Sequence, residues 1–247
     1  AAQGLGYAMA KRFVAEGARV LLADIDGERV AKTAATLAPR AFAIPHVADV
    51  GEEGQVEEMV ALATENFGGV DILVNNAGGA GNVPAIDIED VTVEAWDSVI
   101  RQNLRATFLC CRAVVPQMKK RHFGRIINIS SGLATGKGPL QGTGGTLLAY
   151  ASAKAGILGL TYTLAKAVAR HNIMVNAIVP GFVLTEPGAR VRNWFDSLPE
   201  QGRTALLTRT AMGRAGDPAE LASLAVFLAS GECSYVSGSA IEINGAG

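Results

Sequence analysis

Apolar and polar positions alternate along the chain between a helical and a strand-like pattern. Over residues 5–14 the apolar positions recur at helical spacing, Gly17 ends the helix, and residues 19–23 (RVLLA) form a short apolar run that predicts a buried strand. The same order of helix and strand repeats to near the C-terminus. The pattern predicts further helices near residues 27–37, 52–67, 92–121 and 150–170, and further strands near 41–47, 70–75, 125–129, 174–179 and 238–247.

The predicted strands are apolar on both faces and are separated by helices. Such strands need cover on both sides, which favours an α/β fold with a doubly wound, Rossmann-like parallel sheet flanked by helices. Residues 132–146 are rich in glycine, but no linker-like or low-complexity stretch divides the chain. With 247 residues, 49% of them apolar, the chain can bury one large core, and we expect a single domain over residues 1–247.

The first residues, AAQGLG, resemble the tail of a glycine-rich turn whose feeding strand is absent. In a doubly wound sheet that first strand is central, and its loss would leave neighbouring strands with unpaired backbone groups, at about 1 to 3 kcal/mol for each buried group. We therefore expect the native protein to continue upstream of Ala1 by roughly one short strand of about 5 to 6 residues.

Charge, cysteine and histidine content narrow the class of function. The 22 Lys and Arg residues nearly balance the 23 Asp and Glu residues, so no overall field attracts nucleic acid or a membrane surface, and we expect a small-molecule substrate. The three cysteines include no C-x-x-C pair, and an odd number does not suit a disulfide framework, which favours a reducing cytoplasm. No apolar run approaches the roughly 18 residues of a membrane-spanning helix. His46, His122 and His171 are scattered without ligand spacing, so no metal site is predicted.

A glycine turn and an acidic residue together predict a dinucleotide site. Gly4-Leu5-Gly6 leads straight into a helix, where bare backbone amides and the positive helix end can approach a pyrophosphate, although glycines before a helix are also ordinary turn residues. Asp24, followed by Ile25, ends the next strand 18 residues after Gly6. An acidic side chain there accepts hydrogen bonds from the adenosine ribose and repels a 2′-phosphate, which favours NAD over NADP. A solvated loop carboxylate is the alternative reading of Asp24.

Other loops that follow predicted strands carry polar or turn-forming residues. Open α/β sheets bind ligands at the carboxyl ends of their strands, so we assign these loops to the same cofactor site. The Asn and Gly residues of 75–78 also have an explanation without a ligand, because both residue types tolerate the positive φ of a tight turn. The loop residues are Asp49, Val50, Asn75, Asn76, Ala77, Gly78, Pro180 and Gly181.

Tyr150 and Lys154 lie four residues apart, so their side chains share one face of a helix. The same spacing recurs in two more pairs, Tyr7 with Lys11 and Tyr162 with Lys166. Position decides between the pairs, because only Tyr150 is expected to begin its helix near the strand ends. An ammonium about 5 Å from the phenol, at an effective dielectric near 20, stabilises the phenolate by roughly 3 kcal/mol, or about two pKa units. Tyr150 is therefore predicted to be the general acid or base.

Two further polar residues are candidates for the same site. Ser131 closes the apolar run 126–129 together with Ser130, and its hydroxyl can donate a hydrogen bond to a substrate oxygen as charge develops there. Ser130 is the second choice. Asn103 lies in the middle of the long predicted helix, where a poor helix former indicates either a local hydrogen-bonding function or a satisfied buried amide.

These residues, in this order and over nearly the whole chain, resemble the short-chain dehydrogenase/reductase family. The resemblance implies that Tyr150 donates or accepts the proton, that Lys154 also holds the nicotinamide ribose, and that Ser131 orients the carbonyl. It implies that Asn103 supports a proton-relay water. It further implies contacts of Val183 and Thr185 with the nicotinamide amide, of Asp49 and Val50 with the adenine, and a homotetramer commonly built on the two long helices, or a homodimer.

The chain departs from the family pattern in two places. The first glycine of the family's turn falls before Ala1, and Ser131 and Tyr150 are separated by 19 positions, more than is usual in the family. The extra residues lie in 135–147 and predict a longer loop beside the substrate pocket. After Thr185, an amphipathic pattern over 191–198 predicts a short helix within a substrate loop at about 182–215, which covers the nicotinamide or packs against another subunit.

The sequence thus predicts an NAD-dependent oxidoreductase that interconverts a secondary alcohol and a ketone. One alternative is a 3-oxoacyl thioester reductase that uses NADPH, against which Asp24 argues. Another is a noncatalytic NAD-binding scaffold, which would not need a phenol, an ammonium and a hydroxyl directed at one point.

Overall fold

A computed structural model of the chain describes residues 1–37, 43–81, 87–137 and 144–247, without the side chains of 144–146. Its strands are β1 (Val20–Asp24), β2 (Ala43–Val47), β3 (Ile72–Asn75), β4 (Gly124–Ile129), β5 (Ile173–Pro180) and β6 (Ala240–Ile243). Its α-helices are α1 (Gly4–Ala15), α2 (Gly27–Leu37), α3 (Glu53–Phe67), α4 (Val93–Ile100), α5 (Ala106–Arg121), α6 (Gly144–Val168), α7 (Arg190–Ser197), α8 (Glu200–Leu207) and α9 (Pro218–Ala229). Short turns are η1 (Ile88–Asp90), η2 (Arg101–Arg105), η3 (Gly132–Thr135) and η4 (Ala169–His171).

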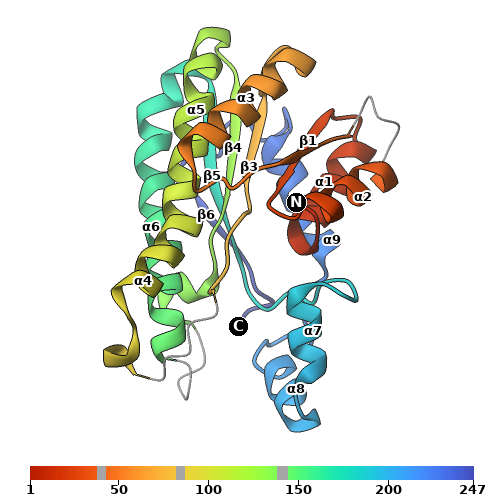
Figure 1. The fold of residues 1–247 in the computed structure, drawn as a ribbon, viewed down its shortest axis with the longest axis vertical. Coiled ribbons are helices and arrows are strands. Elements are labelled where there is room, and N and C mark those ends of the chain that lie inside the picture. The colour runs from red at the N-terminus through yellow and green to blue at the C-terminus, as the bar shows by residue number, and fades with distance from the viewer. Residues whose placement is uncertain (38–42, 82–86, 138–143) are drawn as a thin grey trace. The chain divides into compact units, whose positions relative to one another are not determined.

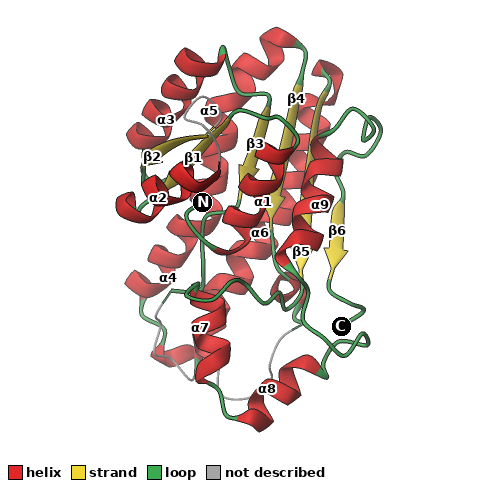
Figure 2. Cartoon of the chain, turned by 90° about the vertical axis from the view of Figure 1, so that its right-hand side faces the viewer, coloured by secondary structure: helices red, strands yellow, loops and turns green. Residues whose placement is uncertain are grey.

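Helices and strands alternate as expected, and the strands pair in parallel (Figure 1). β1 pairs with β2, while the other sheet has the order β3-β4-β5-β6, with these strands side by side in Figure 2. In register, Asn75 at the end of β3 lies beside Asn128 of β4. The predicted Rossmann-like α/β fold is therefore confirmed.

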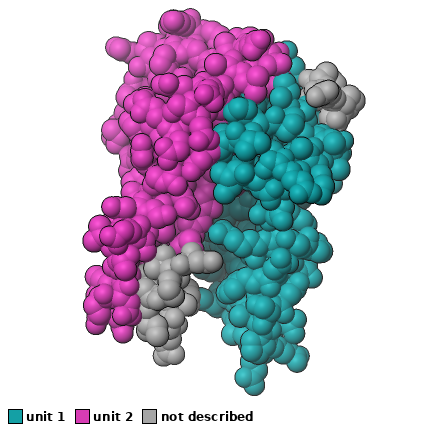
Figure 3. All heavy atoms as spheres, viewed as in Figure 1, with its two compact units in different colours: residues 1–48, 179–233, 242–247 teal, residues 49–178, 234–241 magenta. Residues whose placement is uncertain are grey.

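The chain divides into two compact units (Figure 3). The first unit comprises residues 1–48, 179–233 and 242–247, and the second comprises residues 49–178 and 234–241. The single domain over 1–247 and the strand upstream of Ala1 remain predictions.

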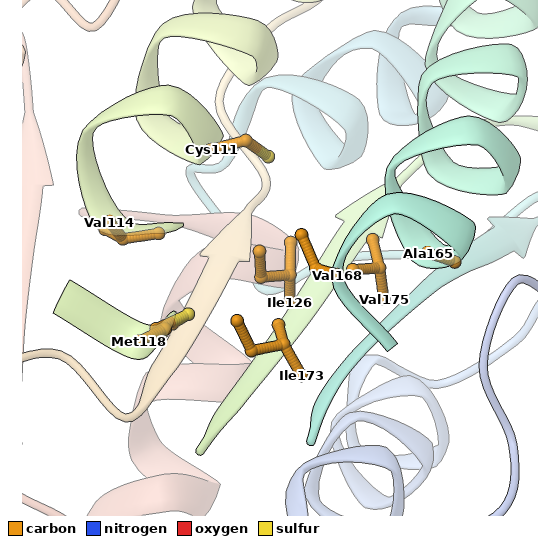
Figure 4. Close-up of a cluster of buried hydrophobic side chains, with 8 residues drawn as sticks. All are labelled: Cys111, Val114, Met118, Ile126, Ala165, Val168, Ile173 and Val175. Carbon is orange, nitrogen blue, oxygen red and sulfur yellow. The ribbon is translucent and has the colours of Figure 1, made fainter. Parts of the chain in front are cut away.

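The core of the second unit lies where α5 and α6 pack on β4 and β5. Every residue of β4 is buried, and side chains from the two helices and the two strands point toward one another (Figure 4). Burial of each large aliphatic side chain contributes about 1.5 to 3 kcal/mol before losses of entropy. The cluster contains Cys111, Val114, Met118, Ile126, Ala165, Val168, Ile173 and Val175. Cys110 and Cys111 are buried free thiols, consistent with the packing role of small apolar residues.

In the first unit, α2 packs on β1 and β2, and α1 packs against α9. Leu22 of β1 and Val30 of α2 are fully buried. Small residues such as Ala10, Ala34 and Ala43 complete this cluster and allow the helices to approach the sheet closely.

The structure corrects two predicted helix boundaries. The predicted helix over 92–121 is interrupted by the π-helical turn η2, so α4 and α5 are separate helices. The helix predicted from Tyr150 begins six residues earlier, at Gly144, because packing outweighs the low helix propensity of glycine. Tyr150 therefore lies in the second turn of α6 and does not begin the helix.

Candidate active site

The four predicted catalytic residues all lie in the second compact unit. Asn103 belongs to η2, Ser131 precedes η3 directly after β4, and Tyr150 and Lys154 belong to α6. Helix α6 contacts both η2 and η3. The fold thus brings residues that are far apart in sequence onto neighbouring elements.

Lys154 is buried beside Tyr150. Its ammonium nitrogen Nζ lies 5.5 Å from the centre of the Tyr150 ring and donates a hydrogen bond of 2.9 Å to the backbone carbonyl of Ile129. Only 3% of Lys154 is exposed, and burial lowers its pKa to about 8. An ammonium has three donors, so two remain beyond the one held by Ile129. The lysine is anchored to the end of β4 and still has hydrogen-bonding capacity for a ligand.

The two serines after β4 have different surroundings. Ser130 is buried, and its hydroxyl donates to the carbonyl oxygen of Lys154 at 2.9 Å. Ser131 is half-buried, and its hydroxyl oxygen accepts a hydrogen bond of 3.2 Å from the N–H of Leu133, at the start of η3. Accepting this bond leaves the Ser131 hydroxyl hydrogen available to donate. The geometry therefore favours Ser131 over Ser130 as a donor to substrate, while Ser130 supports α6.

Asn103 anchors the loop that follows β3. Its side chain is completely buried, with Nδ2 donating to the carbonyls of Gly79 (2.9 Å) and Val99 (2.8 Å) and Oδ1 accepting from the N–H of Gly79 (3.1 Å). Gly78 has φ +136°, and a Cβ placed there would lie 2.2 Å from Asn103 Oδ1. Both Nδ2 hydrogens are used within the protein. The side chain thus fixes the loop, which leaves it no Nδ2 donor for a relay water.

The base of the same loop is fixed by a buried polar network. Asn75 donates through Nδ2 to Asn128 Oδ1 at 2.9 Å and to Cys111 Sγ at 3.3 Å. Asn128 in turn donates to Thr161 Oγ1 of α6 at 2.9 Å. Because the Asn75 side chain faces this interior, only Ala77 and Gly78 of the predicted cofactor loop are exposed.

Asp49 and Val50 lie in the loop before α3. One Asp49 oxygen accepts from the N–H of Gly51 at 2.8 Å, and the other accepts from Arg101 Nη1 at 2.9 Å. Burial raises the pKa of Asp49, but these hydrogen bonds outweigh burial, and the pKa lies below its usual value. Arg101 is a site residue that the sequence analysis missed, since its partner is 52 residues away and leaves no local pattern.

In the first unit, Gly4, Leu5 and Gly6 form the first turn of α1. Gly4 has φ +62°, a left-handed conformation that favours glycine. Its N–H donates to the Glu186 carboxylate at 2.7 Å. A negatively charged group therefore already sits at this helix N-terminus, as the partial positive charge of a helix end favours.

Asp24 is half-buried at the end of β1 and makes several backbone contacts. Its Oδ2 accepts from the N–H of Ala2 (2.8 Å), and its Oδ1 accepts from the N–H of Asp26 (3.1 Å). Ile25 beside it is 73% exposed. The carboxylate has about four acceptor positions, so it can accept one more hydrogen bond.

The segment after β5 contains the remaining predicted residues. Pro180 ends β5, and a Cβ at Gly181 would lie 2.8 Å from the Cα of Asn244, so only glycine fits there. Val183 and Thr185 are buried. Thr185 Oγ1 is buried and has no hydrogen-bond partner among the residues that the structure describes. A buried hydroxyl without a partner costs about 1 to 3 kcal/mol, which a ligand group could offset.

These observations fit a nicotinamide dinucleotide, taken one unit at a time. The first unit offers a helix N-terminus that accepts an anion, the Asp24 carboxylate with a remaining acceptor position, and the Thr185 hydroxyl, which has no partner among the described residues. The second offers Lys154 with two spare donors. Over the described ranges, no group of three or more His, Cys, Asp or Glu could hold a metal ion. No helix in the described parts of the chain is long and apolar enough to cross a membrane.

Comparison with known proteins decides the family. A family model described as enoyl-(acyl carrier protein) reductase matches residues 1–245. The chain belongs to the short-chain dehydrogenase/reductase family. It is an oxidoreductase of that family, which binds a nicotinamide cofactor and a small-molecule substrate.

Relatives of this short-chain dehydrogenase/reductase cover almost the whole chain. The 3-oxoacyl-(acyl-carrier-protein) reductase FabG of Thermotoga maritima is 38% identical, covering 99% of this chain and 94% of that protein. The 2-(R)-hydroxypropyl-CoM dehydrogenase of Xanthobacter autotrophicus is 36% identical, covering 100% of this chain and 95% of that protein. The crystal structure of levodione reductase has a TM-score of 0.86 at 33% identity, covering 99% of this chain and 93% of the other.

Proposed function

We propose that this enzyme interconverts a secondary alcohol and its ketone, with NAD as the hydride carrier and Tyr150 as general acid and base. The observation that carries the proposal is the buried Lys154 ammonium, 5.5 Å from the centre of the Tyr150 ring. At that range a positive charge favours the phenolate, which brings the phenol nearer to the proton affinity that acid–base catalysis needs.

In the oxidation direction, the proton of the alcohol O–H passes to the Tyr150 phenolate. A bound nicotinamide cofactor would supply the acceptor for the hydride that leaves the carbinol carbon. Ser131 donates a hydrogen bond to the substrate oxygen, and Asn103 keeps the loop after β3 in place. In the reverse direction Tyr150 returns the proton to the developing alkoxide.

Two groups of residues are proposed to hold the cofactor. Lys154 directs its spare donors to the nicotinamide ribose, and the orphaned Thr185 hydroxyl bonds the nicotinamide amide together with contacts from Val183. The full proposed set is Gly4, Leu5, Gly6, Asp24, Ile25, Asp49, Val50, Asn75, Ala77, Gly78, Tyr150, Lys154, Pro180, Gly181, Val183 and Thr185.

The preference for NAD rests on Asp24. Its carboxylate, which accepts hydrogen bonds from the N–H groups of Ala2 and Asp26, would repel the 2′-phosphate of NADP and accept from the ribose hydroxyls of NAD. The likeness to a 3-oxoacyl-(acyl-carrier-protein) reductase favours a second candidate, a 3-oxoacyl thioester reductase that uses NADPH. The ratio of kcat/KM for NAD to that for NADP, measured with secondary alcohols and with 3-hydroxyacyl thioesters, separates the two.

The test of catalysis compares two tyrosines of the same helix. Tyr150→Phe removes the proposed acid and base, and turnover should fall by about 10²- to 10⁴-fold. Tyr162→Phe is the matched control, because Tyr162 also lies on α6 with a lysine four residues later, and turnover should stay near that of the wild type. Equal activity of the two variants would contradict the role of Tyr150.

The segment at about 182–215 is proposed to form the substrate loop of a single domain. Its amphipathic helix α7 is held by aromatic contacts, since the Phe182 ring lies 6.2 Å from that of Trp194 and 5.7 Å from that of Phe195. Trp194 remains 49% exposed, which suits a surface that closes over substrate. Trp194→Ala should raise KM for the alcohol more than KM for NAD.

Subunit assembly and location complete the proposal. Phe108 is 45% exposed on α5, which supports a homotetramer or homodimer built on the long helices. Light scattering of the purified protein, with Phe108→Lys as the disrupting variant, measures the assembly.

The three buried free thiols suit a reducing cytoplasm.

A further inference from the structure

The π-helical turn η2 carries two residues that contact different loops. Asn103 is buried and holds the loop at 75–79 through two hydrogen bonds with Gly79, while its third hydrogen bond goes to the Val99 carbonyl of α4. Arg101, two residues earlier, reaches the loop at 49–52. The π turn itself is a departure from regular helix that is frequent at functional sites. One short element therefore contacts both loops.

Arg101 joins two carboxylates of the loop at 49–52. Its Nη1 donates to Asp49 Oδ2 at 2.9 Å and to Glu52 Oε1 at 2.6 Å. The arginine side chain is 31% exposed and that of Asp49 is 34% exposed. The pair of Lys32 with Glu28 on the surface of α2 is far more exposed, so solvent weakens the contact of Arg101 with Asp49 less than that pair.

Gly51 provides the space for this arginine. A Cβ at Gly51 would lie 2.8 Å from Arg101 Nη1 and 3.3 Å from Arg101 Cγ, so the side chain crosses the glycine backbone in close contact. The N–H of Gly51 donates to the other oxygen of Asp49. Asp49, Gly51 and Arg101 thus form one closely packed group, in which a side chain at position 51 would displace the guanidinium of Arg101.

We infer that Arg101 is a positioning residue that ties the adenine-side loop at 49–52 to the turn of Asn103. The inference rests on the proposed function, which assigns Asp49 and Val50 to the adenine. Asp49 uses two acceptor positions on Gly51 and Arg101, which leaves others for an amine of the ligand. Binding of the adenine at this loop then also holds Asn103 and the loop at 75–79.

The test uses Arg101→Met, which removes the charge of Arg101 and keeps most of the apolar part of its side chain. Arg105→Met is the matched control, because Arg105 is an exposed arginine of the same turn that makes no ion pair with any residue the structure describes. Binding of 5′-AMP and of NAD is measured by calorimetry without substrate, and kcat and KM are measured with the best alcohol. Thermal unfolding checks that each variant is folded.

Arg101→Met should weaken 5′-AMP binding by about five- to tenfold and lower kcat, whereas Arg105→Met should change either value less than about twofold. Arg101→Lys should restore part of both values, since an ammonium can pair with one carboxylate. Gly51→Ala keeps every charge but displaces the guanidinium, and should reproduce the direction of the Arg101→Met effect.

The outcomes separate this inference from the proposed function. If the wild-type protein binds neither 5′-AMP nor NAD, the proposed function fails and this inference fails with it. If the wild type binds both and Arg101→Met matches Arg105→Met, only the role of Arg101 is wrong. Weaker 5′-AMP binding with an unchanged kcat would overturn the link to Asn103.

Discussion

The Lys154 ammonium lies between the ring of Tyr150, 5.5 Å from its centre, and the backbone carbonyl of Ile129, to which it donates. This relationship connects the core to the proposed chemistry, because the carbonyl belongs to the fully buried strand β4. A rigid strand end thereby sets the distance between the positive charge and the phenol.

The lowered pKa of Lys154 predicts a pH limit on catalysis. Burial brings that pKa from its usual value of 10.5 to about 8, so the ammonium that favours the phenolate is lost as pH rises through about 8. In the oxidation direction kcat should fall above this pH. Lys154→Arg keeps a charge at all accessible pH values, and the fall should vanish even though overall activity is lower. A fall at the same pH in both proteins would contradict this assignment.

The same shift has a consequence for stability, with a definite sign. Between about pH 8 and 10.5 the unfolded chain keeps the Lys154 proton that the folded chain has lost. The contribution of Lys154 to the free energy of unfolding therefore rises with pH across this window. Below about pH 8 the folded protein bears the full cost of burying the charged ammonium. Urea unfolding of the wild type and of Lys154→Met, at pH values on both sides of 8, measures this contribution, which the variant should lack.

Substitution of Ser131 should mainly reduce turnover, whereas substitution of Ser130 should mainly reduce stability. Ser131→Ala removes the available donor, so kcat should fall by about 10²-fold, and the lost bond from the Leu133 N–H should lower the free energy of unfolding by about 1 kcal/mol. Ser130→Ala removes the bond to the Lys154 carbonyl, so the free energy of unfolding should fall by about 1 to 2 kcal/mol. Full turnover by Ser131→Ala together with inactivity of a folded Ser130→Ala would show that the choice between them is wrong.

Local and long-range features differ in how far the sequence predicts them. The alternation of helices and strands could be predicted, because burial of apolar faces determines it, and the spacing of Tyr150 and Lys154 is a property of any helix. The π turn was not predicted, and its buried residue Asn103 bonds to Gly79, which is distant in sequence and so leaves no local pattern. The contact of Arg101 with Asp49 is long-range for the same reason.

One missed element did leave a signal. Helix α9 begins with Asp217 as N-cap, Pro218 in its first turn and Glu220 completing a capping box, a pattern that predicts a helix start. The start of α6 left no comparable signal, since Gly144 and Gly145 disfavour a helix locally. Packing of α6 against η3 and β4 outweighs that preference.

Asp24 predicts the choice of cofactor. Asp24→Asn removes the charge that repels a 2′-phosphate, and its single oxygen can keep only one of the two backbone N–H bonds. The ratio of kcat/KM for NADP to that for NAD should rise by about tenfold or more. Asp26→Asn is the control, because the Asp26 carboxylate accepts a hydrogen bond from the N–H of Arg29 in the first turn of α2 and is assigned no ligand contact. Initial rates with both cofactors measure the ratio. An unchanged ratio in Asp24→Asn would remove the argument for NAD.

Gly78 predicts how strongly the loop after β3 depends on Asn103. In Gly78→Ala the new Cβ would lie 2.2 Å from Asn103 Oδ1, and φ +136° is unfavourable for alanine. Gly136→Ala has the same kind of backbone cost at φ +77° but nothing within 4 Å of its Cβ. The control should lose about 1 kcal/mol of unfolding free energy and Gly78→Ala at least about 1 to 3 kcal/mol more, because the Asn103 bonds must break as well. If urea unfolding showed equal losses of unfolding free energy for Gly78→Ala and Gly136→Ala, the Asn103 side chain could move at no cost and would not fix the loop.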